Sequence, residues 1–132
     1  MRRNFACSAA PLSSLRAAEY NEPGNDLFHY CEVAFMLTVQ KFGGSSVAGD
    51  DGLTRTAELI ALEHRKSRSV AAVVSAEGDT SDVLTERAKG ISPEPPEREL
   101  DALLSTGELG SAAIMAIKLR AMGLDCISLS GR

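Results

Sequence analysis

The sequence contains no tryptophan, and aromatic residues of all kinds make up only 5% of it. It therefore offers little for a nucleic-acid surface built on base stacking. The net charge of −4 gives no electrostatic attraction to nucleic acid or to an anionic membrane, so we expect neither as a partner. No uninterrupted apolar run approaches the length of a membrane span.

Cysteine and histidine are also scarce. The three cysteines, Cys7, Cys31 and Cys126, are odd in number and scattered, which does not indicate a disulfide framework. Reduced thiols are typical of cytoplasmic proteins, and we expect this location. His29 lies close to Cys31, but two ligands do not make a zinc site, so we expect no metal site of the protein's own.

The first 35 residues differ from the rest. They show no sustained helical or strand period, and the opening stretch carries Arg2, Arg3 and Arg16 without an acidic residue, as organelle transit peptides do. We favour a different interpretation, in which residues 1–35 are an extension that is disordered or precedes the true start at Met36. Residues 36–132 then form one partial domain.

Regular patterns begin after Met36 and alternate between strand and helix. Strands are expected at Leu37–Phe42, Ser69–Ser75 and Asp125–Ser130, and helices at about residues 53–64, 80–89, 97–104 and 105–122. Asp50 or Asp51 can cap the first helix, and Gly123 suits the end of the last. The continuous apolar run Ser69–Ser75 predicts a strand covered on both faces. This order indicates an α/β fold with a mostly parallel sheet.

A glycine pair ends the first expected strand, in the run Lys41-Phe42-Gly43-Gly44-Ser45-Ser46. Ligands gather beyond the carboxyl ends of parallel strands. Glycines let the backbone approach a ligand closely, and a preceding lysine adds a charge suited to phosphate. The run predicts a phosphate-binding turn, although the spacing of a Walker A loop is absent and a plain strand-ending turn would look the same.

Two further segments could bind a polar ligand. Ser75 ends the second expected strand, and Gly78-Asp79-Thr80-Ser81-Asp82 follows it at a strand-to-helix junction. Asp79 or Thr80 could equally do no more than cap the helix. In Ser105-Thr106-Gly107-Glu108, the carboxylate could hold a substrate ammonium group, but S-x-x-E is also the capping-box pattern.

Taken together, these segments resemble aspartate kinases of the amino acid kinase superfamily, over about Leu37 to Gly131. The matching residues are Lys41-Phe42-Gly43-Gly44-Ser45-Ser46-Val47, Val73-Val74-Ser75-Ala76, Gly78-Asp79-Thr80-Ser81-Asp82, Arg98-Glu99-Leu100-Asp101, Leu104-Ser105-Thr106-Gly107-Glu108 and Ser128-Leu129-Ser130-Gly131. The resemblance implies the N-terminal half of a three-layer α/β/α sandwich. It also implies transfer of the γ-phosphoryl group from MgATP to L-aspartate, the first step toward lysine, threonine and methionine.

The resemblance also implies roles for single residues. Lys41 would stabilise charge on the transferred phosphoryl group. The nucleotide phosphates would be bound by Lys41, Phe42, Gly43, Gly44, Ser45 and Ser75. Thr80, Ser81 and Asp82 would line the aspartate pocket, and Glu108 would receive the aspartate ammonium. Mg²⁺ would arrive with ATP, and full-length members of the family are expected to be homo-oligomers.

Two departures from the family pattern bear on activity. Ser81 stands where the family has a second threonine, which keeps a hydroxyl and predicts a mild effect. The family also continues beyond the last motif, whereas this sequence stops at Arg132, so we expect a fragment that is inactive alone. Two alternatives remain open: a non-catalytic module that binds aspartate or associates with a kinase, and an enzyme of another amino acid kinase class.

Overall fold

The computed structural model describes residues 3–7, 37–66 and 69–130. After the first strand, strands and helices alternate along the chain. In chain order the elements are β1 (Arg3–Cys7), β2 (Leu37–Phe42), a 3₁₀ turn (Gly44–Ser46), α1 (Gly49–His64), β3 (Ser69–Val74), α2 (Thr80–Ile91), α3 (Glu97–Ala121) and β4 (Cys126–Ser128). The predicted α/β fold is confirmed, and β2 and β3 lie where the sequence places them. Residues 8–36 lie outside the described residues, and with them most of the segment predicted to be disordered or to precede the true start at Met36.

The four strands form one sheet in the order β2-β3-β1-β4. β2 and β3 are parallel, in register from Leu37↔Ser69 to Phe42↔Val74. β1 is antiparallel to both β3 and β4, so β4 runs in the same direction as β2 and β3. The carboxyl ends of these three strands therefore meet at one edge of the sheet, as the sequence predicts. The difference is Arg3–Cys7, a strand within the segment expected to be unstructured.

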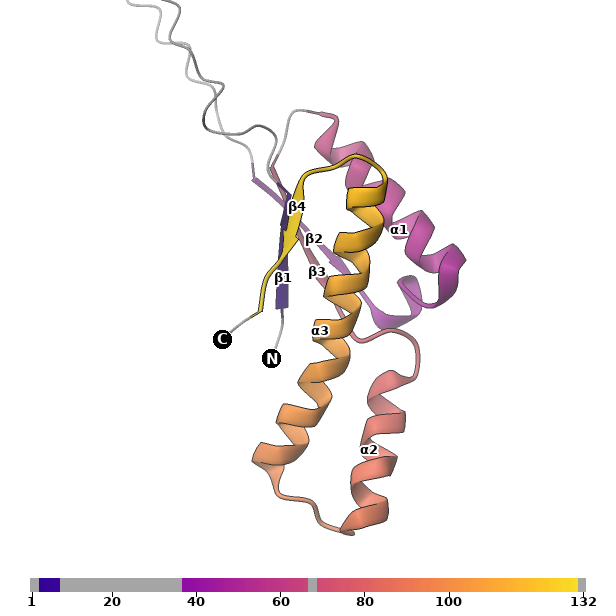
Figure 1. The fold of residues 1–132 in the computed structure, drawn as a ribbon, viewed down its shortest axis with the longest axis vertical. Coiled ribbons are helices and arrows are strands. Elements are labelled where there is room, and N and C mark those ends of the chain that lie inside the picture. Colours follow the sequence, from indigo (N-terminus) through magenta and orange to yellow (C-terminus); the bar gives the residue numbers. More distant parts are fainter. Residues whose placement is uncertain (1–2, 8–36, 67–68, 131–132) are drawn as a thin grey trace, which may run out of the picture.

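Helices α1 and α3 lie on one side of the sheet, and α2 lies beyond the end of the sheet beside α3 (Figure 1). Residues of β3 alternate between buried and half-buried, with Val70, Ala72 and Val74 on the buried side. They pack against Ile60 of α1 and, from α3, against the side chains Ala112, Met115 and Leu119. The prediction that β3 is covered on both faces is therefore wrong for the described residues, because no helix among them packs against the other face.

Helix α3 is one continuous helix of 25 residues, not the two helices that the sequence predicts. The Ser105 hydroxyl donates to the Ala102 carbonyl at 2.7 Å, as a serine inside a helix does. The capping-box alternative for Ser105 and Glu108 is excluded, because the helix begins at Glu97. By length and composition α3 could also cross a membrane, which is weak evidence because core helices pass the same test.

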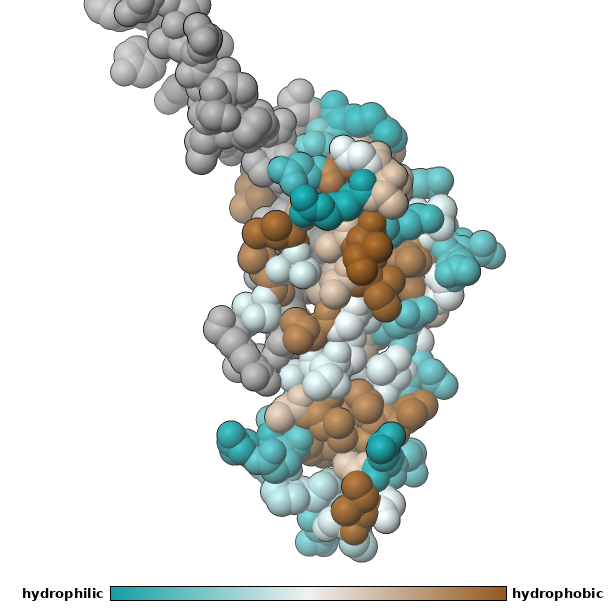
Figure 2. Space-filling view, viewed as in Figure 1, coloured by the Kyte–Doolittle hydropathy of each residue, from teal (hydrophilic) through white to brown (hydrophobic). Residues whose placement is uncertain are grey.

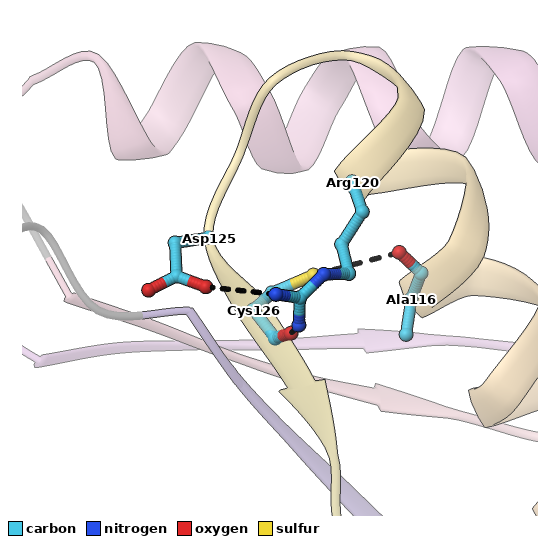
Figure 3. Close-up of polar contacts among 4 residues, drawn as sticks. All are labelled: Ala116, Arg120, Asp125 and Cys126. Atoms are coloured by element: carbon cyan, nitrogen blue, oxygen red, sulfur yellow. Dashed lines mark hydrogen bonds and ion pairs between the residues drawn. The ribbon is translucent and has the colours of Figure 1, made fainter.

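Helix α3 ends at a glycine, as predicted, and side-chain contacts join this end of the helix to β4. Gly123 has φ 84°, and the N–H of Leu124 donates to the Leu119 carbonyl at 3.1 Å, as in a Schellman motif. Figure 3 shows Arg120 reaching across to the start of β4, where it contacts Asp125 at 3.4 Å and donates to the Cys126 carbonyl at 2.7 Å. The buried Cys126 thiol donates to the Ala116 carbonyl at 3.6 Å. These contacts hold β4 against α3.

Candidate functional site

The glycine turn after β2 lies directly against the turn after β3. A Cβ atom on Gly44 would lie 2.4 Å from the Ala76 carbonyl oxygen, closer than real side chains come. The Gly78 N–H donates to the Gly44 carbonyl at 3.2 Å, and Gly78 has φ 54°. Glycine is therefore needed at position 44 because two backbones pass too close for any side chain.

The glycine turn has the form of a short 3₁₀ helix with Lys41 beside it. The N–H groups of Ser46 and Val47 donate to the carbonyls of Gly43 and Gly44, respectively, and these bonds close the turn. Lys41 is exposed, and its Nζ lies 3.8 Å from the position of a Cβ on Gly43. An ammonium group thus lies next to the backbone of the turn.

Helix α1 supports the turn from behind. The Thr56 hydroxyl donates to the Ser46 carbonyl at 2.8 Å. The helix begins at Gly49 without a side-chain cap from its N-cap residue, and Asp50 and Asp51 lie in its first turn. The prediction that one of these two aspartates caps α1 is wrong. The cap comes from Glu77, whose Oε1 accepts the Gly49 N–H at 2.7 Å.

Helix α3 brings the third motif to the same place. A Cβ on Gly107 would lie 3.0 Å from Thr80 Cγ2 and 3.2 Å from the Ala76 side chain. The Ser111 hydroxyl accepts the Glu77 N–H at 2.9 Å and donates to the Gly107 carbonyl at 3.0 Å. Gly107 therefore permits close packing of α3 on the turn after β3.

The polar residues of the second and third motifs lie at the start of α2 and inside α3. Thr80 is half-buried, whereas Ser81 and Asp82 are exposed in the first turn of α2. The N-cap residue Asp79 makes no side-chain capping bond, so capping by Asp79 does not account for this segment. Glu108 is half-exposed and follows Gly107 directly on α3. The structure thus brings the three motif segments together, at the ends of β2 and β3.

No motif in the sequence points to Glu77 or Ser111. Their partners lie 28 and 34 residues away along the chain, so no local spacing pattern could have indicated the contacts. Two grooves in the described part of the molecule, of about 490 and 400 Å³, are lined by residues outside the ligand-binding motifs. Among the described residues, no three His, Cys, Asp or Glu side chains gather into a metal-binding group.

The close approach at Gly44 gives a direct test of this geometry. We expect Gly44→Ala to lower the free energy of unfolding by about 1–3 kcal/mol, because the added methyl group must displace backbone at Ala76. Gly43→Ala is the matched control. It meets only the flexible end of Lys41, so we expect a change within about 0.5 kcal/mol. Urea unfolding of both variants measures the difference, and equal midpoints would contradict the close approach.

The structure thus places a glycine turn, a lysine and small hydroxyl residues at the carboxyl edge of the parallel strands of an α/β sheet. Residues 36–132 match the sequence model described as the amino acid kinase family. The chain belongs to this family.

Within the family, the chain is similar to aspartokinases. The aspartokinase of Mycolicibacterium smegmatis is 44% identical over 95 residues, which cover 72% of this chain and 23% of that protein. The Thermus thermophilus aspartokinase is 46% identical over 88 residues, which cover 67% of this chain and 22% of that protein. A crystal structure of aspartate kinase from Synechocystis matches with a TM-score of 0.63 and 43% identity, covering 65% of this chain and 15% of that one. The chain therefore spans less than a quarter of the length of these relatives.

Proposed function

We propose that this chain is the N-terminal part of an aspartate kinase catalytic domain. The reaction converts ATP and L-aspartate to ADP and 4-phospho-L-aspartate. The observation that carries the proposal is the meeting of three distant motifs at the strand ends, where Gly44 lies against Ala76 and Gly107 lies against Thr80. The aspartokinase relatives support the choice of aspartate as acceptor.

The residues at the glycine turn suit ATP phosphates. Lys41 offers a point charge for the transferred phosphoryl group, while Gly43, Gly44 and Ser45 form the turn beneath it and Ser75 follows the neighbouring strand. An aspartate carboxylate is already ionised at neutral pH, so the reaction needs no general base. Positioning and charge neutralisation then supply most of the catalysis.

Magnesium enters the proposal bound to ATP. Mg²⁺ typically keeps several waters and binds through substrate phosphates, so the ion would be held mainly by the nucleotide. Bound there, Mg²⁺ would neutralise charge on the phosphates. The protein's own task at this edge is to hold the phosphates and orient the acceptor.

The acceptor would lie beside the start of α2. Thr80, Ser81 and Asp82 present hydroxyls and a carboxylate there, and Glu108 on α3 supplies the negative charge for the aspartate ammonium. The pathway then leads to lysine, threonine and methionine. We place the protein in the cytoplasm, with ATP and L-aspartate as its small-molecule partners and a homo-oligomer as the state of the complete enzyme.

A chimaera tests the proposal. Residues 36–132 of this chain replace the matching segment of the Mycolicibacterium smegmatis aspartokinase, which is 44% identical over 95 residues. An ATP-dependent hydroxamate assay compares the acceptors aspartate, glutamate and acetylglutamate. UMP forms no acyl phosphate, so its phosphorylation is followed by the release of ADP. We expect turnover with aspartate. A folded chimaera without aspartate turnover would favour the non-catalytic module, and turnover with another acceptor would indicate another kinase class.

Glu108 has the most specific role in the acceptor site. In the chimaera, Glu108→Gln is expected to weaken aspartate binding by about 1.5–3 kcal/mol, the range for a hydrogen bond to a charged group. The capping-box explanation no longer competes, because Glu108 lies in the interior of α3. We therefore expect little change in melting temperature.

Steady-state KM for aspartate and thermal melting measure these two effects separately. Glu58→Gln is the matched control, since Glu58 is an exposed glutamate on α1 outside the motifs. We expect it to leave both quantities near those of the unaltered chimaera. An unchanged KM together with a lowered melting temperature in Glu108→Gln would assign Glu108 a structural role only.

A further inference from the structure

Glu77 lies between two of the family motifs and belongs to neither. It follows Ala76 in the turn after β3, where its side chain is half-buried. Its carboxylate accepts the Gly49 N–H at the start of α1 at 2.7 Å, and its own N–H donates to the Ser111 hydroxyl of α3 at 2.9 Å. One residue thus joins the turn to both helices that cover the sheet.

The carboxylate contact reaches across the glycine turn. The loop that leads from β2 into α1 contains Gly44, whose carbonyl accepts the Gly78 N–H at 3.2 Å, and it ends at Gly49. Glu77 therefore holds the far end of this loop while Gly78 holds its near end. Hydrogen bonds at both ends thus restrain the loop that contains the 3₁₀ turn.

The same contact occupies the N-terminus of α1. A helix N-terminus attracts anions, because its first N–H groups lack partners inside the helix. Here a carboxylate of the protein already takes the Gly49 N–H, and Asp50 and Asp51 add negative charge in the first turn. Phosphate is therefore directed away from α1 and toward Lys41 and the glycine turn.

We propose that Glu77 is a positioning residue that preorganises the glycine turn for phosphate by clamping the start of α1. This inference rests on the proposed function for its effect on ATP, but the clamp itself is a property of the chain. Glutamine keeps an oxygen that can accept the Gly49 N–H, whereas alanine removes it. The two substitutions therefore separate loss of the clamp from loss of charge.

Amide hydrogen exchange of the full 132-residue chain tests the clamp without any activity. We expect exchange at Gly49 to be about fivefold to tenfold faster in Glu77→Ala than in the unaltered chain, and nearly unchanged in Glu77→Gln. Ser111→Ala is the control for general loosening, since it leaves the Glu77 carboxylate in place. An unprotected Gly49 in the unaltered chain, or equal acceleration in Ser111→Ala, would overturn the proposal.

Kinetics of the chimaera test the consequence for ATP. Glu77→Ala is expected to raise KM for ATP by about fivefold to tenfold with kcat nearly unchanged, and Glu77→Gln is expected to restore KM. A purely structural role would lower the active fraction, and hence kcat, without changing KM, which would refute positioning. An inactive unaltered chimaera would count against the proposed function, while the exchange data would still decide on the clamp.

Discussion

No ATP-dependent phosphorylation of L-aspartate is expected from the 132-residue chain by itself. The motifs at the ends of β2 and β3 would supply only a phosphate turn and part of an acceptor site in the proposed function. The relatives in which the activity resides are more than four times as long as the matched segment. Holding both reactants in line can be worth roughly 7–11 kcal/mol of the barrier, and this contribution is lost when the nucleotide is not held.

The surface of the chain gives a physical reason to expect association as well. On the sheet face away from the helices, Leu37 and Val39 are 63% and 65% exposed. Figure 2 shows further hydrophobic patches along α2 and α3, and Ile117 and Ile91 are 69% and 84% exposed. Exposed apolar patches beside an edge strand favour association.

The hydroxamate assay on the purified chain measures the first expectation, and light scattering measures the second. The chimaera is the positive control for the assay, because it contains the same residues 36–132. Turnover by the chain above background, abolished by Lys41→Ala, would contradict the prediction and make the short chain an enzyme in its own right. A monodisperse monomer would contradict the expected association.

The sequence predicts the parts of this fold that depend on local patterns. β2 and the turn at Gly123 follow from a short β-rich run and from a glycine past a helical stripe, and both lie where expected. The sequence predicts two helices in place of α3, because Ser105-Thr106-Gly107 looks like a helix start. The break does not occur: the helix continues through Gly107, where a Cβ would lie close to Thr80 and Ala76.

The candidate site is predictable in its motifs but not in its internal contacts. The order of the motifs along the chain indicates that Lys41, Ser75 and Thr80 belong to one edge of the sheet, and the parallel register of β2 and β3 places them there. The contact from Glu77 to Gly49 depends on how two turns pack in space. A local rule assigns the cap of α1 to its own aspartates, and tertiary structure supplies a glutamate from elsewhere instead.

Replacing Lys41 by alanine is expected to lower kcat of the chimaera by a factor on the order of 10²–10³, as removal of one preorganised charge-stabilising group does in other enzymes. Lys41 is exposed at the end of β2, with its Nζ beside the glycine turn. Its charge would act on the phosphoryl group as negative charge shifts during transfer, so the loss should affect kcat more than KM. An exposed side chain contributes little to packing, so the free energy of unfolding should change by no more than about 0.5 kcal/mol.

Two further substitutions make the Lys41 result specific. Lys89→Ala removes an exposed lysine near the end of α2, 4.0 Å from Glu86, and is expected to leave kcat unchanged. Lys41→Arg keeps the charge but replaces a compact ammonium with a planar guanidinium, and we expect it to restore only part of the lost activity. Steady-state kinetics with saturating aspartate and urea unfolding measure the two quantities. If Lys41→Ala kept the kcat of Lys89→Ala, the charge at position 41 would have no part in phosphoryl transfer, and the glycine turn would be a structural turn that ends β2.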